Sequence, residues 1–194
     1  MHGACSMIGK KIAIVGVHGT GKTALVYDVA ATLKMHHHVN VGITSEGARS
    51  CPYLLAHDFV PEAETNIFAR QLVAETDAIR LHDLVICDKS PAEVVMYANL
   101  FFPAPSPIHE AQFAAMEAFA RIHMRSYDVI FRTTTLFDLT LTDDPMRPTD
   151  PAMQLRAHNS LRELLDDFKL TYVDLPPHNQ TEFIVQFLID RHLF

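Results

Sequence analysis

Residues 10–23 read KKIAIVGVHGTGKT, and this stretch decides the fold. Four apolar residues over 12–15 predict a short buried strand. The glycine and lysine spacing over 16–23, G-x-x-x-x-G-K-T, is typical of a phosphate-binding loop. The apolar pattern that follows predicts a helix from Lys22 to about Met35. A strand directly before the glycines and a helix directly after them are the context that this motif requires, so the stretch predicts nucleotide binding.

Each residue type in this loop has a chemical task. Glycines let the backbone curl until successive N–H groups point at an anion, and the start of the following helix adds its positive dipole end. Lys22 would contact the β- and γ-phosphates of ATP, and the Thr23 hydroxyl would ligate Mg²⁺. The alternative is a glycine-rich turn without a ligand. The predicted nucleotide-binding residues are Gly16, His18, Gly19, Thr20, Gly21, Lys22 and Thr23.

Length and composition fit one enzyme-sized domain over residues 1–194, with a loose leader over 1–9. A hydrophobic content of 48% and a charged content of 20% are ordinary for a soluble globular protein. The net charge of −7 argues against a broad non-specific nucleic-acid surface. Three scattered cysteines predict neither a metal motif nor a disulfide framework. With no apolar run long enough to span a membrane and no signal-peptide core, we expect a cytoplasmic protein.

Two charged residues follow the second predicted strand, which covers residues 39–44. A helix separates this strand from the first, so the two should run parallel. Ligands of open parallel sheets bind beyond the carboxyl ends of the strands, where Glu46 and Arg49 would lie. Glu46 would accept a proton or hydrogen bond from a hydroxyl of the phosphoryl acceptor, and Arg49 would hold an anionic group. The alternative is a solvated ion pair.

The third predicted strand, over residues 83–88, ends in a carboxylate. Asp88 at the tip of a buried strand beside a phosphate loop is well placed to hold Mg²⁺, and Lys89 would neutralise phosphate charge. Residues 90–93, SPAE, have a structural explanation instead. They predict a helix start with a serine N-cap, a proline at the first helical position and a glutamate that completes a capping box.

The rest of the chain alternates helical and strand patterns. The segment 50–61 reads as a loop or short helix that covers a pocket, and Gln71 lies inside the next helix, facing the site or solvent. The remaining predicted helices cover 62–82, 91–102, 109–125, 151–168 and 181–193, and the remaining strands cover 127–132 and 170–175.

The segment 133–150 is polar and contains prolines. A loop of this length inside a compact domain is usually functional, so we interpret it as a lid region. Arg147 would move over bound ATP and stabilise charge on the transferring phosphoryl group. The alternative is a solvent-exposed loop arginine.

The order of these motifs resembles a known family. GVHGTGKT, SEGAR, Gln71, ICDKSPAEVVMYA, YDVIF, DDPMR and YVDL follow one another as in the AAA-domain/ribosylnicotinamide-kinase-like group. That group sits within the nucleoside and nucleotide kinases related to thymidylate kinase. The resemblance covers nearly the whole chain, and it rests on the specific phosphate loop and on the shared order of the shorter motifs.

The resemblance implies an α/β fold, the P-loop NTPase three-layer sandwich with a five-stranded parallel sheet, flanking helices and a lid segment. Glu46 and Arg49 match an E-x-x-R element that faces the acceptor, and Arg147 matches the lid arginine. Residues 88–90, DKS, match a D-R-S element between acceptor and phosphates. Lys89 stands where arginine is usual, and a lysine cannot make the planar bidentate contact. The resemblance also implies a homodimer.

The leading hypothesis is an ATP- and Mg²⁺-dependent kinase that acts on a nucleoside- or nucleotide-like acceptor. Lys22 and the loop amides would bind phosphates, and Thr23 and Asp88 would hold the metal. Glu46 or Asp88 would orient the acceptor, and Arg147 would close the lid. One alternative is a phage-type kinase that phosphorylates 5-hydroxymethyluracil in DNA. The other is a nucleotide-dependent switch ATPase that binds a protein partner.

Overall fold

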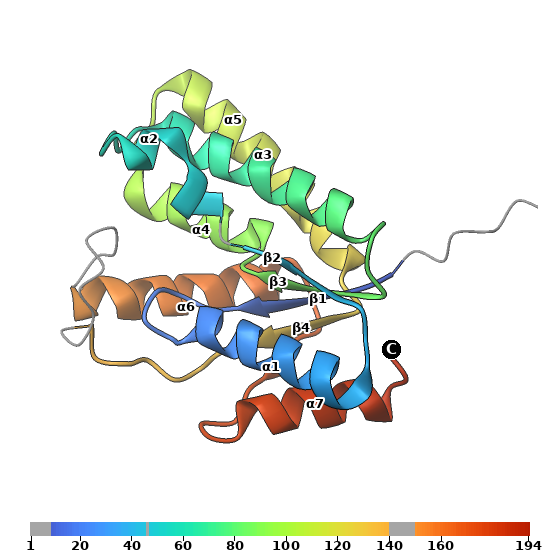
Figure 1. The fold of residues 1–194 in the computed structure, drawn as a ribbon. Helices are drawn as coiled ribbons and strands as arrows, with labels where there is room; N and C mark the ends of the chain where they lie inside the picture. The colour runs from blue at the N-terminus through green and yellow to red at the C-terminus, as the bar shows by residue number, and fades with distance from the viewer. Residues whose placement is uncertain (1–8, 46, 140–149) are drawn as a thin grey trace, which may run out of the picture.

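The computed structural model describes residues 9–45, 47–139 and 150–194. Its centre is a five-stranded sheet with helices on both faces (Figure 1). The strands lie in the order β2-β3-β1-β4-β5, and each neighbouring pair is parallel. The bounds are β1 Lys10–Val15, β2 Val41–Thr44, β3 Leu84–Asp88, β4 Val129–Arg132 and β5 Val173–Asp174.

Seven α-helices and two short 3₁₀ turns surround the sheet in the described residues. Five of the helices begin with a proline, whose fixed φ suits the first helical position and whose missing N–H costs nothing there. The helices are α1 Lys22–His37, α2 Pro52–Leu55, α3 Pro61–Ala78, α4 Pro91–Phe101, α5 Pro107–His123, α6 Pro151–Asp167 and α7 Gln180–Asp190. The turns are η1 Gly47–Ser50 and η2 Met124–Ser126.

The hydrophobic core has two parts, one on each face of the sheet. Successive residues of a strand point to opposite faces, so Ile12 and Ile14 pack toward α1 and α7. Ala13 and Val15 pack toward the layer that contains α3, α4, α5 and α6. Because both faces are covered, the strands read as continuous apolar runs, which is why the sequence showed them so clearly.

The topology brings the candidate residues to one edge of the sheet. Ile14 lies opposite Asp88 in the β1–β3 ladder, so the loop after β1 and the end of β3 are neighbours. The turn η1 follows β2, which pairs with β3 on its other side. All the carboxyl ends therefore meet at the same edge, where parallel sheets bind ligands.

Four predicted strands are longer in the sequence pattern than in the structure, where β3 begins at Leu84 and β4 at Val129. The strand expected over 39–44 begins only at Val41, and the strand expected over 170–175 is reduced to Val173–Asp174. β5 is an edge strand with a single neighbour, β4, so hydrogen bonds support only a short stretch of it. Within the described part of the chain, no helix is both long enough and apolar enough to cross a membrane.

Candidate active site

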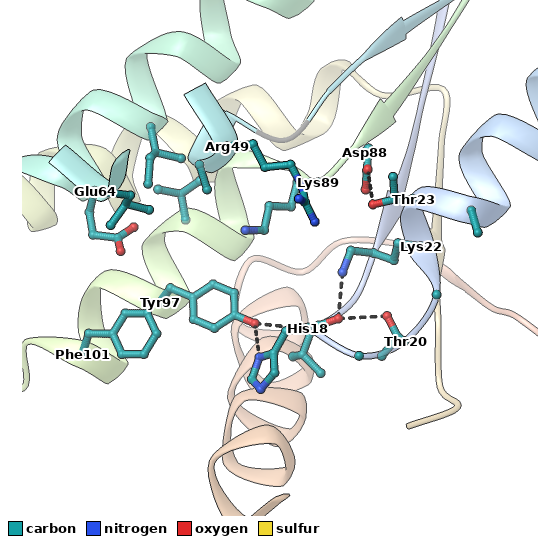
Figure 2. A pocket seen from close by; sticks show the side chains of 18 residues that line it. His18, Thr20, Lys22, Thr23, Arg49, Glu64, Asp88, Lys89, Tyr97 and Phe101 are labelled. Carbon is teal, nitrogen blue, oxygen red and sulfur yellow. Dashed lines mark hydrogen bonds between the residues drawn. The ribbon is translucent and has the colours of Figure 1, made fainter. Parts of the chain in front are cut away.

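A cavity of about 390 Å³ lies at the carboxyl edge of the sheet, between the loop after β1 and the helices α3 and α4 (Figure 2). Its lining contains all the predicted site residues that the structure describes, apart from Gly16. Arg49 lines it from η1. Glu46 and Arg147 lie outside the described residues, so their roles stay predictions.

The glycines of the loop allow a close backbone curl. Gly21 adopts a φ of 75° immediately before α1, a conformation that favours glycine. At Gly16 a Cβ atom would collide with the Thr133 side chain, so a larger residue does not fit. No side chain of the described residues caps the first turn of α1. The first turn of α1 lines the cavity, and its N–H groups and positive dipole end form an arrangement that can hold an anion.

Residues from the far end of the chain hold the loop in this shape. The Phe137 N–H donates to the Gly19 carbonyl at 2.8 Å. The Gln154 side chain, from α6, donates to the His18 carbonyl at 3.0 Å. The Thr133 hydroxyl donates to the Val15 carbonyl at 3.2 Å. The loop is therefore preorganised before any ligand arrives.

Lys22 lies inside the curve of the loop. Its side chain is largely buried, and Nζ donates to the Val17 carbonyl at 2.8 Å (Figure 2). The same Nζ lies 3.7 Å from Oε1 of Glu93. The ammonium is thus held between a carbonyl and a carboxyl group at the wall of the cavity.

Glu93 does more than the predicted capping box. The Ser90 N–H donates to its Oε2 at 2.8 Å, which confirms the cap on α4. Its Oε1 accepts from the Gly16 N–H of the phosphate loop at 3.2 Å. Burial raises the pKa of Glu93 to about 7, although the charge of Lys22 opposes this. Sequence reasoning missed the second role because no local pattern links a capping glutamate to a loop 77 residues away.

Thr23 and Asp88 meet as the sequence predicted. The Thr23 hydroxyl donates to Oδ2 of Asp88 at 2.7 Å, which joins the start of α1 to the end of β3. Hydroxyl and carboxylate oxygens are the hard ligands that Mg²⁺ prefers. The donor set therefore fits the predicted metal.

Lys89 has an unusual backbone conformation for a large residue, with a φ of 90°. Its carbonyl accepts a hydrogen bond from Nε2 of Gln71 at 3.3 Å. Its ammonium lies 5.1 Å from the centre of the Tyr97 ring. The side chain therefore extends into the middle of the cavity (Figure 2). Gln71 itself faces neither cavity nor solvent, because it is buried beneath Lys89.

A buried polar cluster supports Gln71 from below. Glu75 is 1% exposed and accepts hydrogen bonds from Gln71 at 2.8 Å and Tyr127 at 2.6 Å through Oε1. Its Oε2 accepts from Lys11 at 2.8 Å and contacts the His123 ring at 2.8 Å. Burial favours the neutral acid, but His123 and Lys11 outweigh it and lower the pKa of Glu75. This ionised centre orders the layer beneath the site.

α4 contributes an aromatic wall that the sequence analysis did not single out. The Tyr97 hydroxyl accepts from the His18 N–H at 3.0 Å and contacts the His18 ring at 2.8 Å. Phe101 stacks on Tyr97 with ring centres 5.3 Å apart. Glu93, Tyr97 and Phe101 follow one another at intervals of four, so they lie on one helix face. That spacing is the sequence signal that could have identified this wall of the cavity.

Glu64, on α3, also escaped the sequence analysis. It lines the cavity on the side away from the phosphate loop (Figure 2). Burial raises the pKa of its carboxyl to about 7, and the charge of Lys89 partly opposes this. The first turn of α3 is rich in acids, so nothing in the pattern marked this one.

The chain matches a known protein family over most of its length. A model of a family described as an AAA domain matches residues 11–182, which is most of the sequence. The chain belongs to this AAA domain family. No curated protein matches this AAA domain.

Two solved structures are similar to this AAA domain. One is a NadR protein in complex with NAD and AMP-PNP, with 17% identity and a TM-score of 0.71. The other is a NadR protein in complex with NR, with 17% identity and a TM-score of 0.74. Each match covers 94% of this chain and 49% or 51% of the NadR chain, so this AAA domain spans about half the length of those structures.

Fold and family together confirm the predicted fold class. The five-stranded parallel sheet with flanking helices is the P-loop NTPase fold that the sequence predicted. In this AAA domain the phosphate loop, its lysine and the Thr23–Asp88 pair occupy one end of a single cavity. The fold is thus a nucleotide-binding one.

Proposed function

We propose that this AAA domain is an ATP- and Mg²⁺-dependent kinase for a nucleoside- or nucleotide-like acceptor. The observation that carries the proposal is the two-ended cavity. One end holds Lys22 and the Thr23–Asp88 pair, and Arg49 and Lys89 line the space beyond them. A nucleoside triphosphate and a second ligand would therefore meet inside one cavity. The NadR structures, whose names include AMP-PNP in one case and NR in the other, support this proposal on the level of fold.

In this proposal each residue binds either the phosphates, the metal or the acceptor. The loop amides and the start of α1 hold phosphate oxygens, and the Lys22 ammonium neutralises their charge. Thr23 and Asp88 would hold Mg²⁺, which supplies charge neutralisation on the phosphoryl oxygens when it is bound. Arg49 and Lys89 hold the acceptor close to the phosphates.

The reaction balances without a further reactant. The acceptor hydroxyl oxygen forms a bond to the γ-phosphorus, and the bond from that phosphorus to the bridging oxygen breaks, so ADP leaves. The hydroxyl proton passes to a carboxylate. Glu46 is the carboxylate that the sequence predicts for this role, because Asp88 would hold the metal.

The test is ADP release with ATP and Mg²⁺ against nucleosides, nucleoside monophosphates, nicotinamide riboside and DNA that contains hydroxymethyluracil. Lys22→Ala should lower kcat/KM at least about 100-fold, because it removes a charge that stabilises the transferring phosphoryl group. Lys34→Ala, at an exposed position of the same helix, is the matched control and should leave the rate unchanged.

Other outcomes would redirect the proposal. Full activity of Lys22→Ala would refute it. Turnover with DNA alone would support the DNA-kinase alternative. Turnover that only a protein partner stimulates would support the switch ATPase.

A further inference from the structure

The end of the cavity away from the phosphate loop contains a largely buried acid that receives no hydrogen bond from the described residues. Glu64 is 7% exposed and lines the cavity. Figure 2 shows its carboxyl pointing into the space beside Tyr97 and Phe101. Among the described residues no donor forms a hydrogen bond with it, and only the longer-range charge of Lys89 acts on it.

The other buried glutamates of the described chain are fully engaged. Glu75 contacts four side chains, and Glu93 accepts from two backbone N–H groups and lies beside Lys22. A largely buried carboxyl without a protein donor is costly, because it has lost most of its water and no hydrogen bond from the chain replaces it. Glu64 therefore stands out as a group whose partner comes from outside the chain.

The walls around Glu64 suit a flat ring. Leu54, Ile67 and Phe101 contribute apolar surface to the cavity, and Figure 2 shows Phe101 at the end where Glu64 lies. Phe101 lies nearly parallel to Tyr97, with an angle of 18° between the ring planes. Lys89 reaches over Tyr97 and separates this end from the phosphate loop. The arrangement is apolar on its sides and carries one acceptor group, which is the usual composition of a specific small-molecule site.

We infer that Glu64 is a specificity-determining residue of the acceptor subsite, and that it selects a heterocyclic base that donates a hydrogen bond. The inference rests on the proposed kinase function. The sugar hydroxyl of the acceptor would face Lys89 and the phosphates, and the base would lie against Phe101 with an N–H group directed at Glu64. Above pH 7, where Glu64 is ionised, a base that presents only acceptors, or a carboxylate, is rejected because its negative end meets another negative end.

The electrostatics agree with this assignment. Burial raises the pKa of Glu64 to about 7, and a ligand N–H would lower it again. The charged groups that share the cavity with Glu64 are Lys22, Arg49, Asp88 and Lys89. Binding of a donor near pH 7 therefore releases a proton from Glu64 in the wild type.

The experiment uses two matched pairs of acceptors. Nicotinamide riboside offers an amide N–H where nicotinic acid riboside has a carboxylate, and uridine offers an N–H that N3-methyluridine lacks. Binding without ATP is measured by calorimetry, in two buffers that differ in ionisation heat, and turnover is measured with ATP. The variants are Glu64→Leu and Glu64→Gln.

Glu64→Leu should fold at least as stably as the wild type, because Glu64 has no hydrogen bond to lose. It should raise the Kd and KM of the two N–H donors about 10- to 100-fold, the usual effect of losing a hydrogen bond to a charged group. The kcat should stay within about twofold, and preference within each acceptor pair should disappear. Proton release should vanish in both variants. Glu62→Gln, two residues earlier and exposed, is the control and should change none of these values.

The outcomes separate the two proposals. Turnover in which the donor preference survives Glu64→Leu overturns the subsite and leaves the kinase function standing. Donor binding that depends on Glu64, without phosphoryl transfer to any acceptor, supports the subsite and overturns the kinase function. Failure of all four acceptors to bind the wild type overturns the subsite.

Discussion

Truncation of Glu93 to alanine is the sharpest test of how α4 supports the phosphate loop. One carboxyl group accepts the Gly16 N–H at 3.2 Å and the Ser90 N–H at 2.8 Å. It also accepts the Ser90 hydroxyl at 3.3 Å and lies 3.7 Å from Nζ of Lys22. Alanine removes all of these contacts at once and puts no acceptor in their place.

These contacts set how much unfolding free energy the Glu93→Ala variant should lose. Each buried N–H group that loses its acceptor costs about 1–3 kcal/mol, and the loss of one partner of a buried ion pair costs about 3–5 kcal/mol. These terms overlap, and relief of the desolvation of Glu93 offsets part of them. The net loss of unfolding free energy should be about 4 kcal/mol. A stable domain has only about 5–15 kcal/mol in total, so the effect is large.

Urea denaturation followed by circular dichroism measures this loss. With an m-value of about 2 kcal/mol per molar urea, the midpoint should fall by about 2 M. Glu93→Gln keeps one acceptor oxygen, but its amide N–H₂ must face a donor, so it should lie between wild type and Glu93→Ala. It provides the measurement if the alanine variant does not fold. Both variants should weaken binding of an ATP analogue, because Gly16 and Lys22 lose their support.

Glu163→Ala, on the exposed face of α6, is the matched control and should stay within about 0.5 kcal/mol of wild type. A Glu93→Ala protein as stable as this control would refute the claim that Glu93 connects the helix to the loop.

Two further predictions concern other buried groups. Burial raises the pKa of Glu64 from 4.5 to about 7, so between these pH values the folded chain holds a proton that the unfolded chain releases. Its contribution to the unfolding free energy should therefore fall by up to about 3 kcal/mol as the pH rises from about 4.5 to 7. Urea midpoints at pH 5 and pH 8 should show this slope as the difference between wild type and Glu64→Leu, and equal slopes would contradict it. Gln71→Leu removes the hydrogen bonds to Glu75 and to the Lys89 carbonyl, at 2.8 and 3.3 Å. It should cost about 1–3 kcal/mol and raise the KM of the acceptor more than it lowers kcat, whereas Arg70→Leu, its exposed neighbour, should do neither. Unchanged stability and KM in Gln71→Leu would show that Lys89 holds its conformation without that support.

Much of the fold was readable because its signals are local. The strand, loop and helix over residues 10–23 are encoded by neighbouring residues, and so is the capping box that starts α4. Asp88 was recognised for the same reason, since it ends an apolar run. Strand lengths were less predictable, because β5 depends on how far its only neighbour extends beside it.

The parts that sequence reasoning missed depend on contacts between distant residues. Gln71 had two plausible orientations along its helix, and it took neither, because Glu75 and the Lys89 carbonyl lie beneath the site. Glu64 is one of two acids in the first turn of α3, and its place in the cavity appears only when α4 packs opposite it. Glu46 and Arg147 remain predictions from the sequence alone.

From the sequence alone came the glycine-rich loop and the parallel sheet of the P-loop fold, and the prediction that Thr23 and Asp88 hold a metal. Those features arise from runs of a few residues whose backbone and side-chain preferences act locally. Only the packed chain showed the strand order, the double role of Glu93 and the burial of the Glu64 carboxyl at the cavity wall. Burial and hydrogen bonding are properties of neighbours in space, and here those neighbours lie many residues apart in the sequence.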